Sequence, residues 1–166
     1  MVTADTYTSP TQGQLTSTEV IQNVAAFLHQ DPAAFYRLVI GSDSQEHRLN
    51  DDKLCSFVTA IVVHKVGHGG RYFWKNGRKE KIHSIRQKIY TETLLSLETA
   101  EKLVPQLRQK LNGSHNWDLE IHIDVGSVGK SRDMIKEVVG MVIGNGYTAK
   151  TKPDSYAAST VADKHT

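Results

Sequence analysis

Four acidic residues, Asp43, Glu92, Asp124 and Asp163, have the side-chain chemistry to bind a divalent cation. Asp43 directly follows Ile40–Ser42 in an apolar run, where burying a carboxylate without a partner is costly. Asp124 ends a run of alternating residues, and the carboxyl end of a strand is a common place for a ligand group in α/β proteins. A simpler interpretation of either aspartate is that it caps a turn or a loop.

Glu92 is the most informative of the four because of its place on a predicted helix. At ~100° per residue, it projects about 20° from Ile85 and about 20° from Leu103, inside the apolar stripe of that helix. A glutamate on a core-facing stripe needs a cation, a strong hydrogen-bond partner or a buried salt bridge. Glu98 and Glu101 project to other sides of the helix, and solvation explains them.

Asp163 follows Tyr156 by seven residues and so shares a helical face with it. An exposed terminal aspartate is the alternative interpretation, and Asp154 is a rival for the same role. Four carboxylates in one place raise one another's pKa, and Mg²⁺ or Mn²⁺ relieves the repulsion because these ions prefer oxygen ligands. Two ions about 4 Å apart can flank a phosphodiester, one activating the attacking water and the other stabilising the leaving oxygen.

Two histidines are weaker candidates for substrate contacts. His122 shares strand parity with Asp124, and His165 closely follows Asp163, so either ring is placed to orient water or shuttle a proton. An ordinary surface or half-buried histidine is the alternative for each. The other six histidines form no zinc-binding pattern.

The run Asp124–Ser131 reads DVGSVGKS and differs from a phosphate-binding GxxxxGK[ST] loop at its first position. A carboxylate there would repel the phosphates that such a loop holds. A weaker version remains open, in which Lys130 and the helix N-terminus at Ser131 hold one phosphate of a nucleic-acid backbone. A solvated loop lysine is the alternative.

The segment Arg71–Lys81 mixes aromatic and basic residues. One interpretation is a hairpin that contacts a nucleic-acid backbone, with Tyr72, Phe73 or Trp74 stacking on bases. The other is an ordinary strand with a solvated polar face.

Alternating helical and strand patterns must position these residues. A capping box at Thr16–Glu19 begins an amphipathic helix that ends near Asp31–Pro32. Three strands then predict an antiparallel meander with turns at Asn50–Asp52 and Asn76–Gly77. The strands are Tyr36–Ser44, Cys55–Val66 and Arg71–Lys75. The later elements are a helix at Ser84–Leu111, a strand at Trp117–Val125, a helix at Ser131–Ile143, a strand at Tyr147–Lys152 and a helix at Ser155–His165.

The 166 residues predict a single domain over residues 16–166, behind a flexible N-terminal arm of residues 1–15. A net charge of +2 permits a nucleic-acid partner without requiring one. The single cysteine, Cys55, excludes an intramolecular disulfide and is predicted to be a core thiol. No apolar run approaches about 18 residues, and the N-terminus lacks a signal-peptide core, so we expect a cytoplasmic protein without membrane spans.

Four runs of the sequence resemble the ribonuclease H-like YkuK family, and the resemblance covers roughly residues 17–166. They are IGSDSQ at 40–45, KIYTETLLS at 88–96, IHIDVG at 121–126 and GNGYTAKTKPDSYAASTVADKHT at 144–166. The resemblance implies a ribonuclease H-like α/β fold: a mixed five-stranded sheet, three antiparallel strands then parallel strands, flanked by helices, with an extra N-terminal helix.

The resemblance also implies a role for each acid. Asp43 matches the aspartate of the first strand, Glu92 the helix glutamate, Asp124 the aspartate that ends the fourth strand, and Asp163 the last acid. It implies a nuclease that uses Mg²⁺ or Mn²⁺ on DNA or RNA. Because fold does not settle activity, a catalytically inactive domain that binds nucleic acid or a protein is the second hypothesis.

Overall fold

The computed structural model describes residues 5–113, 115–126, 129 and 132–155. One seven-stranded sheet in the order β2-β1-β5-β4-β3-β6-β7 organises these residues. The elements are β1 (Thr6–Ser9), β2 (Gly13–Thr16), α1 (Ser17–Gln30), β3 (Phe35–Leu49), β4 (Asp52–Lys65), β5 (Gly69–Lys81), α2 (Ile85–Leu111), β6 (Asn116–His122), a 3₁₀ turn (Arg132–Met134), α3 (Ile135–Gly144) and β7 (Thr148–Lys150).

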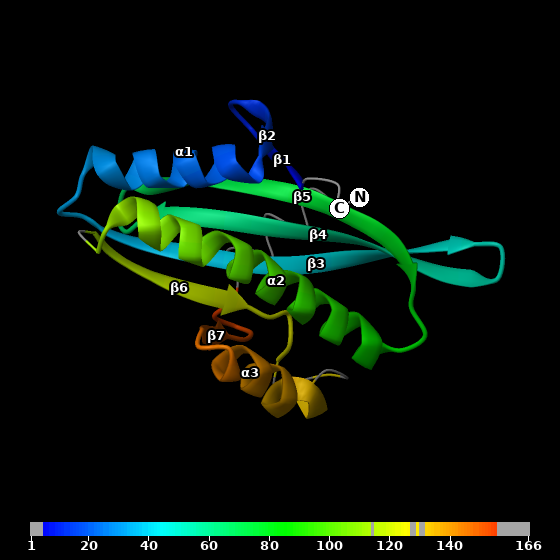
Figure 1. Cartoon of the computed structure of the whole chain (residues 1–166). Helices are drawn as coiled ribbons and strands as arrows, with labels where there is room; N and C mark the ends of the chain where they lie inside the picture. The colour runs from blue at the N-terminus through cyan, green and yellow to red at the C-terminus, as the bar shows by residue number, and fades with distance from the viewer. Residues whose placement is uncertain (1–4, 114, 127–128, 130–131, 156–166) are drawn as a thin grey trace.

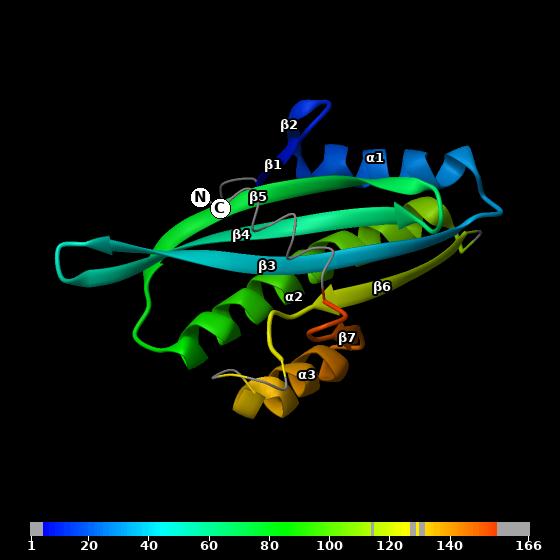
Figure 2. The ribbon, with the colours of Figure 1, turned by 180° about the vertical axis from the view of Figure 1, so that it is seen from behind.

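The central strands confirm the mixed α/β fold that the resemblance implies. Strands β3, β4 and β5 form the antiparallel meander, β6 runs parallel to β3, and β7 runs parallel to β6. The three α-helices that the structure describes lie on one face of the sheet (Figures 1 and 2). Within the described residues, none of the helices has the length and apolar character needed to cross a membrane.

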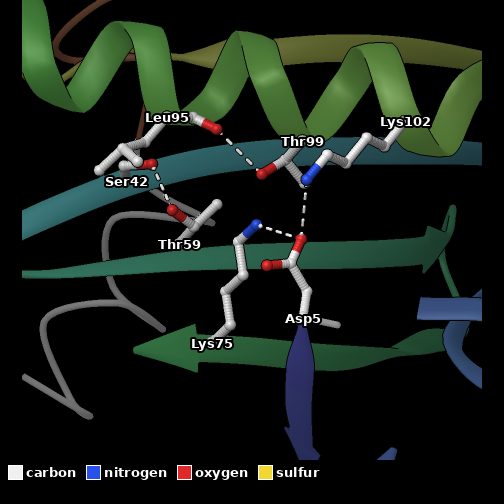
Figure 3. Close-up of polar contacts among 7 residues, drawn as sticks. All are labelled: Asp5, Ser42, Thr59, Lys75, Leu95, Thr99 and Lys102. Atoms are coloured by element: carbon white, nitrogen blue, oxygen red, sulfur yellow. Dashed lines mark hydrogen bonds and ion pairs between the residues drawn. The ribbon is translucent and has the colours of Figure 1, made fainter. Parts of the chain in front are cut away.

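The N-terminal region differs from the flexible arm expected for residues 1–15. Residues 6–16 form the β1–β2 hairpin, which joins the sheet where Thr8 pairs with Trp74 of β5. Figure 3 shows Asp5 between two lysines, with its Oδ2 atom 3.2 Å from Lys75 Nζ and 3.2 Å from Lys102 Nζ. Burial opposes ionisation of Asp5, but these two ammonium groups lower its pKa overall. The two ion pairs link the chain before β1 to both β5 and α2.

Strand β5 also differs from the expected strand Arg71–Lys75 followed by a turn. It continues through Asn76–Gly77 to Lys81, and the register with β4 shifts between Ser56 and Val58. The extra residue of a β-bulge absorbs this shift, so an Asn-Gly pair that usually marks a turn lies inside a strand here.

Helix α1 begins as the sequence predicts. Glu19 N–H donates to Thr16 Oγ1 over 3.2 Å, and Thr16 N–H donates to Glu19 Oε1 over 3.2 Å, which completes the capping box. The helix buries its apolar face against the sheet. Tyr36 OH then donates to the Asp31 carbonyl over 3.0 Å, which fixes the connection from α1 into β3.

Helix α2 changes character along its length. Its second half buries apolar side chains: Leu103, Val104, Leu107 and Leu111. Towards its start and middle it also buries polar ones, Glu92, Thr93, Ser96 and Thr99, beside Ile89, Leu97 and Ala100. Ser42 Oγ lies 2.9 Å from Thr59 Oγ1 and 2.8 Å from Ser96 Oγ, and Thr99 donates to the Leu95 carbonyl over 2.9 Å. Figure 3 shows the contacts of Ser42 with Thr59 and of Thr99 with Leu95. Small hydroxyl groups therefore hold the first half of α2 against β3 and β4.

The buried core confirms the prediction for the single cysteine. Cys55 is fully buried beside Phe57 and Ile82. Burial raises the pKa of its thiol, which is the behaviour of an inert core residue rather than a nucleophile.

Candidate active site

The candidate site lies where β6 leaves the sheet. Pairing between β3 and β6 ends at Gly41 and His122, whereas β3 continues beside β4 as far as Leu49. Within the described residues, β3 therefore has an open edge from Ser42 onward on the side of β6. Figures 1 and 2 show the first half of α2 beyond the arrowhead of β6. Three segments that are distant in sequence, namely β3, the first half of α2 and the loop after β6, lie near one another at this edge.

Glu92 lies in the interior at this place, as the helical stripe predicts. It is 4% exposed, and Ser44 Oγ donates to its Oε1 atom over 2.6 Å. Burial raises the pKa of Glu92 to about 8; the Ser44 hydrogen bond opposes this shift, and the charges of Asp43 and Asp124 add to it. The carboxylates of Asp43 and Asp124 are therefore close enough to destabilise the ionised form of Glu92.

Asp43 reaches the site from the other face of β3. Successive side chains of a strand point to opposite faces, and Ser42 and Ser44 both bond to α2. Asp43 pairs with Val58, which belongs to the small cluster on the face opposite the helices. The half-buried Asp43 thus starts from the face of β3 opposite to α2, and its charge still helps to raise the pKa of Glu92.

Asp124 holds the third position, two residues after β6 ends. Its Oδ1 atom lies 2.9 Å from Lys152 Nζ. The Asp124 hydrogen bond raises the pKa of Lys152, and the charges of Asp43 and Glu92 raise it further. One ammonium group therefore interacts with all three carboxylates. We call Asp43, Glu92 and Asp124 the acid cluster.

The donor set of the acid cluster is that of a hard cation, because it consists of three carboxylates and carries no thiolate or imidazole. Within the described residues, no group of three or more His, Cys, Asp or Glu side chains is gathered closely enough to hold a metal ion. The opposite faces from which Asp43 and Glu92 start contribute to this separation. The residues fit Mg²⁺ or Mn²⁺ by the chemistry of their oxygen ligands.

Several candidates from the sequence lie outside the described residues, namely Asp163, His165, Lys130 and Ser131. Asp154, the rival to Asp163, is exposed and lines a groove of about 590 Å³ together with Arg37, Glu120 and His122. It thus borders this groove rather than Glu92.

His122 belongs to a second charged group, which sequence parity alone does not reveal. Its Nε2–H donates to Glu120 Oε2 over 2.9 Å, and Arg37 Nε lies 3.2 Å from Glu120 Oε1. Burial lowers the pKa of His122 in spite of Glu120, so the neutral ring is favoured. His122 is therefore a hydrogen-bond partner of Glu120.

The sequence analysis does not identify two of the site residues, Ser44 and Lys152. Both stand inside the runs that carry the family resemblance, IGSDSQ and the C-terminal run, but neither residue type signals a site. Ser44 has the same strand parity as Ser42, which was the available clue to its contact with α2.

The aromatic segment of β5 divides between the two faces of the sheet. Phe73 is 3% exposed in the main core, so it does not stack on a base. Tyr72 and Trp74 stack on each other, with ring centroids 5.7 Å apart.

Comparison with known proteins agrees with the geometry. A family model described as "Ribonuclease H-like" matches residues 19–166. The chain is also similar to the "Uncharacterized protein YkuK" of Bacillus subtilis (strain 168), with 35% identity over 164 residues and 93% of each chain covered. No solved structure matches the chain.

Proposed function

Because this chain belongs to the ribonuclease H-like family, we propose that it is a metal-dependent nuclease that hydrolyses phosphodiester bonds of DNA or RNA. In this proposal Asp43, Glu92 and Asp124 hold the metal, and Asp163 supplies the fourth carboxylate. The substrate is a nucleic acid, whose phosphodiester would be attacked by a water molecule that the bound metal activates.

One observation carries the proposal: Glu92 is buried on the core-facing side of α2, 4% exposed and 2.6 Å from Ser44 Oγ, where the charges of Asp43 and Asp124 help burial to raise its pKa. If the position of Glu92 on the core-facing stripe served packing alone, an apolar residue would suit it better, because burying a charge without a cation is costly. Carboxylates from a strand, a helix and a loop that interact in this way form the pattern that divalent cations stabilise.

The residues of the chain have separate tasks in this proposal. Ser44 holds one oxygen of Glu92, which leaves the other oxygen for a ligand. Asp124 stands outside the strand, where its side chain is 32% exposed and accessible to an ion. When bound, two Mg²⁺ or Mn²⁺ ions would supply the activated water and stabilise the leaving oxygen.

A nuclease assay tests the proposal. The purified chain is incubated with single strands, duplexes, RNA–DNA hybrids and junctions, in Mg²⁺, in Mn²⁺ and in EDTA. We expect metal-dependent cleavage of at least one substrate and a loss of at least about a hundredfold in Asp43→Asn and Asp124→Asn. Asp118→Asn is the matched control, because Asp118 belongs to β6 but pairs with Arg37. If the wild type cuts no substrate, the proposal is wrong.

A second candidate function is a catalytically inactive domain that binds nucleic acid or a protein. The ion pair between Lys152 and Asp124 favours it, because an ammonium group already neutralises part of the acid cluster. Titration calorimetry with Mg²⁺ and Mn²⁺ separates the two functions. The nuclease binds these ions with an affinity that Asp43→Asn weakens, and the inactive domain does not bind them.

A further inference from the structure

Lys152 stands out among the charged residues near the acid cluster. Its Nζ atom contacts Asp124 Oδ1 at 2.9 Å, and its charge also interacts with Asp43 and Glu92. A lysine that interacts with three acids from a strand, a helix and a loop is more than a surface ion pair with one partner. It supplies positive charge to the same carboxylates that the proposed metal would neutralise.

The backbone around Lys152 is fixed on the loop that carries Asp124. Lys152 N–H donates to the Val125 carbonyl over 2.8 Å, and Ile123 N–H donates to the Lys150 carbonyl over 2.9 Å. A Cβ atom added to Gly126 would lie 3.2 Å from Lys152 Cβ, so the side chain passes closely over a glycine. These contacts place the root of the lysine beside the acid cluster.

The far end of the same side chain is largely exposed. The side chain of Lys152 is 60% exposed, and lysine is a flexible stem that carries a strongly hydrated charge. Exposed ion pairs of this kind contribute little to stability, typically below about 1 kcal/mol. The backbone of Lys152 is thus held in place while its ammonium group is exposed. This arrangement suits an ion pair that forms and breaks, rather than a permanent structural one.

We propose that Lys152 is a built-in counter-ion of the acid cluster, which a divalent cation must displace in order to bind. This inference rests on the proposed function, since it concerns the same carboxylates. In the metal-free protein the ammonium group reduces the repulsion between Asp43 and Asp124, and their repulsion with Glu92 wherever Glu92 is ionised. When Mg²⁺ or Mn²⁺ binds, the lysine swings away from Asp124 into solvent, and the apparent affinity for the ion includes the cost of breaking this contact.

Titration calorimetry with Mg²⁺ and with Mn²⁺, without nucleic acid, tests the inference. Lys152→Met removes the competing charge but keeps the aliphatic stem. We expect about twofold to fivefold tighter metal binding by this variant, the range that an exposed ion pair of up to about 1 kcal/mol represents. Lys152→Arg keeps the charge and should bind the metal like the wild type. Lys150→Met is the matched control, since Lys150 lies two residues earlier on β7, and it should leave the affinity unchanged.

The sign of the effect distinguishes competition from a structural role. If Lys152 only held the loop of Asp124 in place, its loss would weaken metal binding, so equal or weaker binding by Lys152→Met overturns the inference. That result would leave the proposed function standing, provided that the wild type binds metal and cuts nucleic acid. If neither protein binds metal, the proposed function fails and the inference fails with it.

Thermal unfolding supplies a second measurement, and Gly126→Ala a second variant. In EDTA, Lys152→Met should have a lower Tm than the wild type, and Mg²⁺ should raise that Tm more in the variant than in the wild type. Gly126→Ala adds a methyl group against Lys152 Cβ and should shift the metal affinity in the same direction by a smaller factor. A rise of Tm with Mg²⁺ that is no larger in Lys152→Met than in the wild type would contradict the counter-ion role.

Discussion

Two groups of charged side chains lie within a few residues of each other along β6 and the loop after it, and they are built differently. In the first, the buried Glu120 contacts Arg37 Nε at 3.2 Å and His122 Nε2 at 2.9 Å. In the second, the buried Glu92 accepts a hydrogen bond from Ser44 and experiences the charges of Asp43 and Asp124. The first glutamate thus contacts a guanidinium and an imidazole directly, whereas the second contacts a hydroxyl group and experiences the charges of two acids as well as that of Lys88.

The position of each group in the sheet explains this difference. Arg37, Asp118 and Glu120 stand on adjacent, paired stretches of β3 and β6, so the register holds opposite charges side by side. The acid cluster lies beyond the last β3–β6 pair, where no register supplies partners. The strand register thus explains the ion pairs inside the sheet, whereas it supplies no such partners to the acids past the end of β6.

The largest effect should come from neutralising one glutamate of each group. Glu92→Gln is expected to lower the affinity for Mg²⁺ by about tenfold to a hundredfold, because a carboxylate ligand is lost. Glu120→Gln should leave the affinity within about twofold of the wild type, since Glu120 already has its partners. Calorimetric titration of the two variants measures both values, and equal losses in both would mean that the two groups are one metal site.

A second prediction compares the two groups by their contribution to stability instead of metal affinity. Arg37→Met leaves Glu120 beside His122 without its guanidinium and should lower the free energy of unfolding by about 1–3 kcal/mol. The cost stays below that of a fully buried pair, because the Arg37 side chain is 41% exposed and solvent screens it. Urea unfolding at pH 7 measures this loss, and metal affinity serves as the control that should not change.

A third prediction concerns pH and follows from the pKa of Glu92. The pKa rises from 4.5 to about 8 on folding, so the folded protein holds a proton that the unfolded chain releases. The stability contributed by this proton is fully present below pH 4.5 and is lost as pH rises through 8. Glu92→Gln stays neutral throughout, so its free energy of unfolding relative to the wild type should increase from pH 4.5 to 8 and then level off.

The control for this pH experiment is Glu98→Gln, because Glu98 lies on the exposed side of the same helix. The difference between this variant and the wild type should not vary with pH over the same range. A flat difference for Glu92→Gln would contradict the raised pKa. It would also remove the observation on which the proposed function depends.

The sequence predicts the fold well because its patterns are local. The capping box at Thr16, the β-branched strands and the helical stripe of α2 each depend on neighbouring residues, and each is confirmed. The strands at residues 6–16 were missed because a four-residue strand has too few alternating positions to stand out. The turn predicted at Asn76–Gly77 is wrong because β-bulges and tight turns favour the same residue types.

The site was predicted less completely, for a different physical reason. The helical period placed Glu92 correctly, since burial on a helix is periodic. The partners of Glu92 are not periodic: Ser44 and Lys152 reach the site only because β6 ends at His122 and leaves an open edge. The length of one strand relative to its neighbour decides these contacts, and a sequence pattern fixes strand ends least reliably.

The smallest expected effect tests whether His122 belongs to the acid cluster. In the structure His122 donates to Glu120, and burial holds its pKa below the usual value, so its ring is neutral near pH 7. His122→Gln, which keeps a donor for Glu120, should therefore change metal-dependent cleavage by less than about threefold. The pH profile of cleavage in the variant should follow that of the wild type. If cleavage instead drops tenfold or more while urea unfolding shows an intact fold, His122 acts in the reaction. The division between a structural group on β6 and a reactive group beyond it would then be wrong.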